Sequence, residues 1–419
     1  MTTTITIEDY PCGSGKTTNM IKSFKQEEKY LVILYYLSEV NRIIEDTTDV
    51  CFVEPIAEDN IQNTKTESLK ELLLTGQNIA TTHSMYERLV PLAEEGLLDD
   101  YNIIIDEVPE VVKPVSTKSK TSIQEFYISR GFIEVEDNGL VLATDKWRQI
   151  NREVADTLDA EILSYAETGC LYLLGEHMFI WALPSKLLSA GKSVTILTYK
   201  AEGSLVVSYL NKLSLPYFIQ SDKCKEEAFR KQALELIDLQ NIPAINGKKT
   251  KLNLSYSGQL QGMKNKKYIA TITNALKNLR ARQLKGLDLS DVLLTCKKDA
   301  WVKDNGKAGV FAQGSKMFEN TNWIANTTRG TNEYAHCSHL IYLYDQHINP
   351  LVARWLNNNS RYFDDAYALT ELIQWVWRSR IRKGEPITLY LPAPRMRSIL
   401  IDWLEGWDTK GFGEYSVAA

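Results

Sequence analysis

The stretch that most constrains this chain is YPCGSGKTT, Tyr10 to Thr18, which directly follows a short β-like run, Ile5 to Ile7. Glycines at positions 13 and 15 allow backbone N–H groups to close around a phosphate. We expect Thr18 to Glu28 to form a helix whose positive N-terminus faces that phosphate. The pattern predicts a phosphate-binding loop; its alternative is an ordinary Gly-Ser turn between a strand and a helix.

Two side chains of this loop carry chemistry of their own. Lys16 supplies a mobile positive charge, and Thr17 can offer its hydroxyl to Mg²⁺. We therefore expect the whole loop to bind the phosphates of a nucleotide, and its residues are Pro11, Cys12, Gly13, Ser14, Gly15, Lys16, Thr17 and Thr18.

A second pattern, YNIIIDE at Tyr101 to Glu107, is an apolar run long enough for a buried parallel strand, and it ends in two adjacent carboxylates. Asp106 at the strand tip is placed to hold Mg²⁺, directly or through water, and Glu107 to orient or deprotonate an attacking water. Alone, this pattern also fits a buried strand followed by an exposed acidic turn. Combined with the loop, it predicts hydrolysis of a nucleoside triphosphate.

Length and composition bound the class of protein. A chain of 419 residues is too long for one ordinary core, so two or three domains are expected. The densest apolar run, Tyr30 to Leu37, has the length of a strand, well short of the roughly 20 residues that span a bilayer. The N-terminal stretch MTTTITIEDY lacks the basic and apolar regions of a secretory signal. We expect a soluble cytoplasmic protein that binds no membrane.

The six cysteines are scattered and contain no CxxC pair, which fits reduced thiols better than a disulfide framework or a zinc site. One local group of possible metal ligands, His336, Cys337 and His339, has no second ligand pair elsewhere. A polar entry to a strand explains it better than zinc.

Strands and helices alternate through the first part of the chain. Lys29 to Tyr36 is expected to be a strand, Ser38 to Glu45 a helix, and Asn78 to Thr81 a further strand. This alternation predicts a parallel α/β sheet with the phosphate-binding loop at the carboxyl end of a strand.

Polar residues follow these strands at the same edge of the predicted sheet. Ser38 and Ser84 fit helix caps. For Thr82 and His83, helix capping and contact with a nucleic-acid strand both stay open.

From Glu110 to Gly191 the simple alternation stops. Phe132 to Glu136 and Leu140 to Thr144 flank an Asp-Asn-Gly signal for a β-hairpin, and Trp147 to Tyr165 is expected to be one long helix. We interpret this stretch as an insertion in the first domain. Its hairpin is either a wedge between paired nucleic-acid strands or a surface decoration.

Ser193 to Thr198 resumes the sheet, and the crossing into a second domain follows it. We place the first domain at residues 1–212 and the second at 213–419. In the second domain, Leu252 to Tyr256 and Val292 to Thr295 are expected to be strands on either side of a helix.

The net charge of −5 does not by itself indicate a nucleic-acid partner, but the distribution of charge is uneven. Between Leu239 and Leu287 there is no Asp or Glu, while ten basic residues occur, Lys264, Lys266 and Lys267 among them. Such a segment fits contact with a phosphate backbone, and a solvated helix face is its alternative. The helix expected at Lys264 to Lys285 has apolar residues at three- and four-residue steps, which predicts one face for a core.

Near the end of the chain, Asp364 to Arg382 is expected to be a helix and Ile387 to Pro392 a strand. Gln374, Arg378 and Arg382 step by four, so on such a helix they share one face. A surface held by salt bridges is the alternative to a site.

The order of these motifs resembles that of superfamily 2 helicases, closest to the compact DExx-box helicases of bacteriophages. The similar stretches are Tyr10 to Thr17 (motif I), Asp106 to Pro109 (DExx box), Leu197 to Tyr199 (Ser-Ala-Thr motif), Thr81 to His83 (a nucleic-acid contact), Arg329 to Asn332 (Arg-Gly-x-Asp loop) and Gln374 to Arg382 (arginine helix).

This resemblance implies a fold and a set of roles. The fold is α/β, with two tandem RecA-like P-loop domains built on parallel sheets and an insertion with a hairpin and a helix in the first. ATP lies between the domains with Mg²⁺, Gln374 contributes to ATP binding, and Arg378 and Arg382 complete the transition state. Which of Arg378, Arg380 and Arg382 reaches the γ-phosphate stays open. Thr82, His83 and Arg329 contact nucleic acid.

The resemblance thus implies an ATP-dependent helicase acting in the cytoplasm, that of the host if the protein is viral. We expect a monomer that acts on single-stranded or forked DNA, in a role such as DNA replication, with RNA not excluded. Two alternatives remain: a translocase or annealing motor that does not unwind, and a nucleotide-switched binding module.

Overall fold

The computed structural model describes residues 3–47, 49–57, 64–117, 122–153 and 160–407. By their contacts the residues fall into two compact units. Unit 1 contains 1–9, 15–220 and 349–360, and unit 2 contains 10–14, 221–348 and 361–419. The main crossing between the units, at 220/221, follows the expected end of the first domain by eight residues, and the segments 10–14 and 349–360 each group with the unit other than their chain neighbours.

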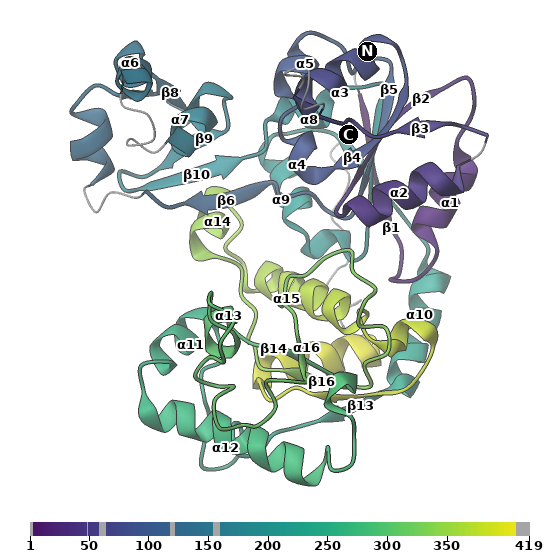
Figure 1. The fold of residues 1–419 in the computed structure, drawn as a ribbon, viewed down its shortest axis with the longest axis vertical. Coiled ribbons are helices and arrows are strands. Elements are labelled where there is room, and N and C mark those ends of the chain that lie inside the picture. The colour runs from purple at the N-terminus through teal and green to yellow at the C-terminus, as the bar shows by residue number, and fades with distance from the viewer. Residues whose placement is uncertain (1–2, 48, 58–63, 118–121, 154–159, 408–419) are drawn as a thin grey trace. The chain divides into compact units, whose positions relative to one another are not determined.

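Unit 1 is built on a seven-stranded sheet (Figure 1). Its strands, in spatial order, are β12 (Tyr217–Ser221), β1 (Thr4–Asp9), β11 (Ser193–Thr198), β5 (Tyr101–Asp106), β2 (Lys29–Leu34), β4 (Asn78–Thr82) and β3 (Phe52–Val53). The pairs from β1 to β3 are all parallel. Only β11 separates β1 from β5, so the loop after β1 and the carboxylates after β5 lie at the same edge of the sheet.

The apolar runs predicted as strands form the core of unit 1. Val32, Leu34 and Ile105 are fully buried, which is why these strands read as continuous apolar runs. The helices of the unit are α1 (Lys16–Ser23), α2 (Leu37–Asp46), α3 (Lys65–Leu74), α4 (His83–Tyr86), α5 (Val90–Glu94), α8 (Ser185–Ser189) and α9 (Leu205–Lys212), with a 3₁₀ turn at Ala201–Gly203. Met20 of α1 and Ile43 of α2 pack with Val32 in one cluster.

Three expected helix starts are wrong in detail. Ser38 and Ser84 are not caps, because the N-cap residues of α2 and α4 are Tyr36 and Thr82, and the serines lie inside the helices. The hydroxyls of Thr82 and Ser84 instead hydrogen-bond to each other at 2.9 Å. The helix after the phosphate-binding loop begins at Lys16, two residues before the expected start.

The insertion has its own small sheet and core. The antiparallel strands β6 (Val112–Val115), β10 (Met178–Ala182) and β9 (Leu171–Leu174) are joined by the hairpin β7 (Ile133–Val135) and β8 (Val141–Ala143), the π-helical turn Gln124–Ile128, α6 (Asp145–Glu153) and α7 (Ala160–Glu167). Tyr127, Trp147 and Phe179 are fully buried in a cluster of this insertion. The predicted hairpin is confirmed, with Gly139 at φ +88° in its turn. The middle of the single helix expected from Trp147 to Tyr165 lies outside the described residues.

Unit 2 is built on a second sheet, whose neighbouring strands are parallel. Its order is β13 (Ile237–Gln240), β17 (Ile387–Tyr390), β16 (His339–Tyr342), β14 (Val292–Thr295) and β15 (Asn322–Trp323). Its helices are α10 (Lys223–Leu236), α11 (Tyr256–Gly262), α12 (Lys266–Arg282), α13 (Lys298–Trp301), α15 (Arg361–Val376) and α16 (Pro394–Glu405), with 3₁₀ turns at Leu289–Asp291 and Arg380–Lys383. The strand expected at Leu252 to Tyr256 is wrong, because Ser255 accepts a hydrogen bond from Gly258 N and caps α11 there.

The helix expected from Asp364 to Arg382 ends early, at Val376. Backbone N–H groups of Arg378 and Ser379 donate to the carbonyls three residues before them, and the Ser379 hydroxyl also donates to Val376 O at 2.7 Å. The chain then forms the 3₁₀ turn. Gln374, Arg378 and Arg382 therefore do not share one helix face, and that prediction is wrong.

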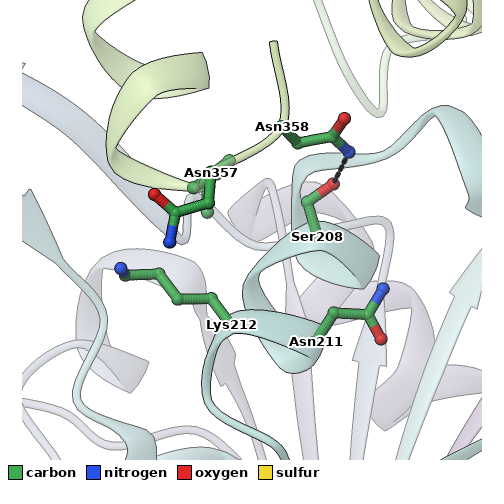
Figure 2. A pocket seen from close by; sticks show the side chains of 6 residues that line it. Ser208, Asn211, Lys212, Asn357 and Asn358 are labelled. Carbon is green, nitrogen blue, oxygen red and sulfur yellow. Dashed lines mark hydrogen bonds between the residues drawn. The ribbon is translucent and has the colours of Figure 1, made fainter. Parts of the chain in front are cut away.

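One segment of unit 1, residues 349–360, contains structure that the sequence did not predict. It contains α14 (Pro350–Trp355), whose Trp355 ring stacks on Tyr209 with ring centroids 5.8 Å apart and lies 4.5 Å below the ammonium of Lys212. Asn358 Nδ2 donates to the hydroxyl of Ser208 at 3.1 Å (Figure 2). An open polar pocket of about 390 Å³ lies here, lined by Ser208, Asn211, Lys212, Leu356, Asn357 and Asn358.

Among the helices of the described residues, none is both long and apolar enough to cross a bilayer.

Candidate active site

The predicted phosphate-binding loop joins β1 to α1. Gly15, the N-cap of α1, has φ +81° and Gly13 has φ +77°, values in the left-handed region that favours glycine. A Cβ built on Gly15 would meet no atom within 4 Å, so backbone conformation rather than space explains the glycine. The N–H groups in the first turn of a helix lack intrahelical acceptors, which suits them to a phosphate.

Thr17 and Asp106 meet at this edge of the sheet. The Thr17 hydroxyl donates to Asp106 Oδ2 at 3.1 Å, although the two residues are 89 positions apart in the chain. Burial and then the neighbouring Glu107 raise the pKa of Asp106 to about 6, against the opposing effects of the Thr17 bond and Lys16. A hydroxyl and a carboxylate are the hard oxygen ligands that Mg²⁺ takes, so this pair fits that ion.

Glu107 has an unusual backbone. Its φ of +66° lies in the left-handed region, which few residues other than glycine adopt. Its N–H donates to Leu197 O of β11 at 3.0 Å. The turn after β5 is therefore held to the neighbouring strand at a residue whose backbone has left strand geometry.

His83 and Tyr35 contact the same turn. His83 Nε2 lies 3.0 Å from Asp106 O, and the Tyr35 hydroxyl donates to Val108 O at 3.3 Å. The two rings pack with their centroids 4.2 Å apart. Burial lowers the pKa of His83 to about 4, so the ring is neutral near pH 7 and Nε2, facing a carbonyl, carries the proton. The assignment of Thr82 and His83 to nucleic acid stays a prediction, with His83 Nε2 engaged in this bond.

The arginines of unit 2 occupy different surroundings. Arg378 is 5% exposed, and its guanidinium lies 3.5 Å from Thr331 O. Gln374 is buried in α15. Arg382 is exposed in the 3₁₀ turn, while Arg380 donates to Pro386 O at 2.6 Å. The roles predicted for Gln374, Arg378 and Arg382 stay predictions.

Arg329, predicted to contact nucleic acid, forms an ion pair with Glu371 of α15. Glu371 is 2% exposed, and the Arg329 side chain is 16% exposed. Arg329 and Arg378 thus both connect the polar loop after β15 to the α15 region.

The basic segment is a surface of unit 2. Lys264, Lys266 and Lys267 are exposed at the N-terminal end of α12, where Asn265 caps the helix through bonds from Lys267 N and Tyr268 N. Ile272, Leu276 and Leu279 are buried on the opposite side, as the periodicity predicts. The lysines are therefore available to an anion that approaches this end of the helix.

Sequence reasoning missed a charged cluster in unit 2. The guanidinium of Arg395 binds Asp365 at 2.7 Å, Asp364 at 2.6 Å and Asp345 at 3.1 Å. His347 Nδ1 lies 2.7 Å from Asp364 Oδ2. Hydrogen bonds to Asp345 and Asp364 raise the pKa of His347 to about 9. These residues are up to 50 positions apart, so no local pattern indicates the cluster.

Comparisons with known proteins agree with this geometry at the level of fold. A model of the YonV C-terminal Rossmann-like domain matches residues 231–404. The SPbeta prophage-derived protein YonV of Bacillus subtilis strain 168 is 27% identical over 432 residues, covering 96% of this chain and 98% of YonV.

Two solved structures are similar over nearly the whole chain. The structure named XPD_APO has a TM-score of 0.54 at 11% identity, and the match covers 96% of this chain and 95% of the XPD_APO chain. The structure named XPD_Helicase has a TM-score of 0.48 at 12% identity, with coverages of 96% and 94%. The first of these shows the fold, which is α/β with two tandem RecA-like domains on parallel sheets, as predicted.

Proposed function

We propose that this protein is an ATP-dependent nucleic-acid helicase that uses Mg²⁺ and acts on single-stranded or forked DNA. The observation that carries the proposal is the 3.1 Å contact between the hydroxyl of Thr17, at the start of α1, and the carboxylate of Asp106, at the end of β5. A glycine loop opening a helix, with a hydroxyl beside a carboxylate at the tip of the second strand along, is the arrangement that P-loop hydrolases use. The helicase-like fold supports the same activity.

In this proposal the loop from Pro11 to Thr18 binds the phosphates of ATP, and Lys16 compensates their charge. Thr17 and Asp106 hold Mg²⁺, which when bound supplies further compensation of charge on the phosphates. Glu107 orients a water and accepts its proton as the water oxygen bonds to the γ-phosphorus and the bond to the ADP oxygen breaks. Arg378 or Arg382 stabilises the charge that develops on the transferred group.

The nucleic-acid strand is proposed to contact Thr82, the three lysines at the start of α12, and the loop that contains Arg329. The lysines support this best, because they are exposed, share one helix end and belong to a segment without acidic residues. Similarity to a protein named as prophage-derived supports a bacteriophage origin. A task in the host cytoplasm, such as DNA replication, is part of the proposal.

The test is steady-state ATP hydrolysis with and without single-stranded DNA or RNA. We expect stimulation of many-fold by a strand, and no turnover in Lys16→Ala. Lys22→Ala, an exposed lysine of the same helix, is the matched control and should resemble the wild type. A protein that hydrolyses ATP slowly regardless of the strand would be a nucleotide switch instead of a motor.

Displacement of a labelled strand from a forked duplex then separates a helicase from a translocase. A helicase releases the strand only with hydrolysable ATP. Strand-stimulated hydrolysis without release would replace the helicase proposal with that of a translocase or annealing motor.

A further inference from the structure

We propose that Tyr35 and His83 form a positioning pair that holds Glu107 in the orientation needed to accept a proton from water. The inference rests on the proposed function, in which Glu107 is the base. It adds two residues to that site, neither of which touches the reacting atoms. Both act through the backbone of the turn at Asp106, Glu107 and Val108.

The first argument is the backbone of the turn itself. At φ +66°, Glu107 adopts a conformation that persists only when surrounding contacts hold it. Three hydrogen bonds to three consecutive residues do so. Glu107 N donates to Leu197 O, while the carbonyl before it accepts from His83 and the carbonyl after it accepts from Tyr35.

The second argument is the origin of the pair. β2 and β4 are adjacent and parallel, with Leu34 opposite Thr82 in the register. Tyr35 directly follows Leu34 and His83 directly follows Thr82, so the register of the two strands places both residues side by side just beyond the edge of the sheet. The two rings pack against each other with their centroids 4.2 Å apart and their planes tilted by 35°.

The third argument is chemical. A backbone carbonyl accepts only, so His83 donates from Nε2 to Asp106 O, while the N–H of the same peptide group, that of Glu107, donates to Leu197 O. The peptide group is therefore held from both sides. Neither bond uses the Glu107 side chain, so the backbone is held without involving the carboxylate.

This pair gives a role to a histidine for which the resemblance to helicases implies contact with nucleic acid. Thr82 and His83 follow β4 together, but the Thr82 hydroxyl bonds to Ser84 whereas His83 reaches back to the end of β5. The two adjacent side chains thus have different hydrogen-bond partners, and of the two it is His83 that bonds to the turn of the acidic pair.

The test compares His83→Leu, which removes the donor, with His83→Gln, which keeps an N–H donor at a similar reach. Tyr35→Phe removes the second donor and keeps the ring. His177→Leu, an exposed histidine between β9 and β10, and Tyr36→Phe, the exposed neighbour of Tyr35, are the matched controls. Each variant is assayed for kcat at saturating ATP, for affinity toward a non-hydrolysable ATP analogue with Mg²⁺, and for thermal unfolding.

We expect His83→Leu to lose about 10- to 100-fold in kcat, the size of effect that a displacement of about 1 Å in a catalytic group produces. Affinity for the analogue should stay within about threefold of the wild type, since uniform binding is not altered. His83→Gln should recover most of the rate, and Tyr35→Phe should lose less than His83→Leu because its bond is longer. Both controls should match the wild type.

Unchanged kcat in His83→Leu would overturn the proposal. So would parallel losses of rate, analogue affinity and melting temperature without recovery in His83→Gln, which would mark a purely structural role. Weaker strand binding with normal kcat at saturating strand would return His83 to the nucleic-acid contact. If wild-type protein neither bound the analogue nor hydrolysed ATP, the proposed function itself would be wrong, and that outcome is separate from the others.

Discussion

Two regions differ in how their geometry arises. One is the proposed nucleotide-binding edge of unit 1, called the nucleotide edge, which contains Thr17 and Asp106; the other is the arginine region of unit 2, Gln374 to Arg382. At the nucleotide edge, Thr17 and Asp106 follow parallel strands whose tips must lie at one edge, so the motif and its placement come from the same local pattern. In the arginine region, Gln374 and Arg378 were expected to share a helix face, but α15 stops at Val376. A phosphate-binding loop carries its own geometry, whereas a helical row of arginines depends on where the helix ends.

The difference in burial is equally instructive. Arg378 is nearly inaccessible and bridges toward the loop at Thr331, while Arg382 is exposed on a separate turn. The resemblance gives both the same role, yet their surroundings are those of a structural arginine and of an arginine that can meet a ligand. Substitution should separate the two.

The largest expected effect is on hydrolysis in the arginine region. Arg382→Ala should reduce kcat by about 10³- to 10⁵-fold if this arginine acts on the transferred phosphoryl group. Because Arg382 is exposed, nucleotide affinity and thermal unfolding should stay near wild type. Lys383→Ala, its exposed neighbour, is the control. Near-normal turnover in Arg382→Ala would move the role to Arg378 and sharpen the contrast between the two residues.

The matching change at the nucleotide edge is Glu107→Gln. A general base contributes typically about 10²- to 10⁴-fold, so kcat should fall by that amount while ATP binding persists. Glu110→Gln, an exposed glutamate three residues on, should leave the rate unchanged. Normal hydrolysis in Glu107→Gln would show that the acidic pair holds the metal and nothing more, which would remove the base from the nucleotide edge.

Other elements show how much of the fold the sequence alone predicts. The strands at Ser193–Thr198 and Val292–Thr295 have the predicted bounds, since β-branched apolar runs that are buried on both sides have few alternatives. The apolar face of α12 is buried as its periodicity predicts. Local composition and spacing were sufficient for these elements.

Other features depend on partners that are distant in the chain. No local pattern shows that Glu371 binds Arg329, 42 positions away, or that His83 bonds to the carbonyl of Asp106. The end of α15 depends on hydrogen bonds made by Ser379, which helix propensity alone does not fix. These contacts need tertiary structure, and they decide what several candidate residues of the site do.

A smaller effect, now on stability, is expected for Glu371→Gln. The change leaves the charge of Arg329 largely buried without its carboxylate, which typically costs about 3–5 kcal/mol. Urea denaturation should show the loss, and the exposed Glu385→Gln should not. A loss below about 1 kcal/mol would mean that the Arg329 side chain moves into solvent, where it could contact a ligand.

Replacing the lysines at the basic end of α12 should change the salt dependence of DNA binding and leave the stability of the protein unchanged. Replacing Lys264, Lys266 and Lys267 by Ser should flatten the slope of log affinity for single-stranded DNA against log salt by up to about 2, since each phosphate contact contributes about −0.7. The same change at the exposed Lys298, Lys303 and Lys307 alters net charge equally and is the control. Equal slopes in the two variants would leave the lysines as a solvated helix face.

The smallest expected effect concerns pH and the cluster around Arg395. Hydrogen bonds to Asp345 and Asp364 raise the pKa of His347 to about 9 from 6.5, so the folded state binds its proton more tightly than the unfolded state does. The stabilisation is therefore complete below pH 6.5 and is lost as the pH rises through about 9. Because the His347 side chain is 42% exposed, solvent screening limits the effect to on the order of 1 kcal/mol.

Urea midpoints measured from pH 6 to pH 10 should fall more steeply in the wild type than in His347→Gln, whose side chain does not titrate. Parallel curves would show that Arg395 alone satisfies the three aspartates. The stability that this cluster contributes to unit 2 would then be as independent of pH as the stability contributed by the apolar core of that unit. A difference confined to the window between pH 6.5 and 9 would instead identify a polar network that stabilises unit 2 through one protonated ring.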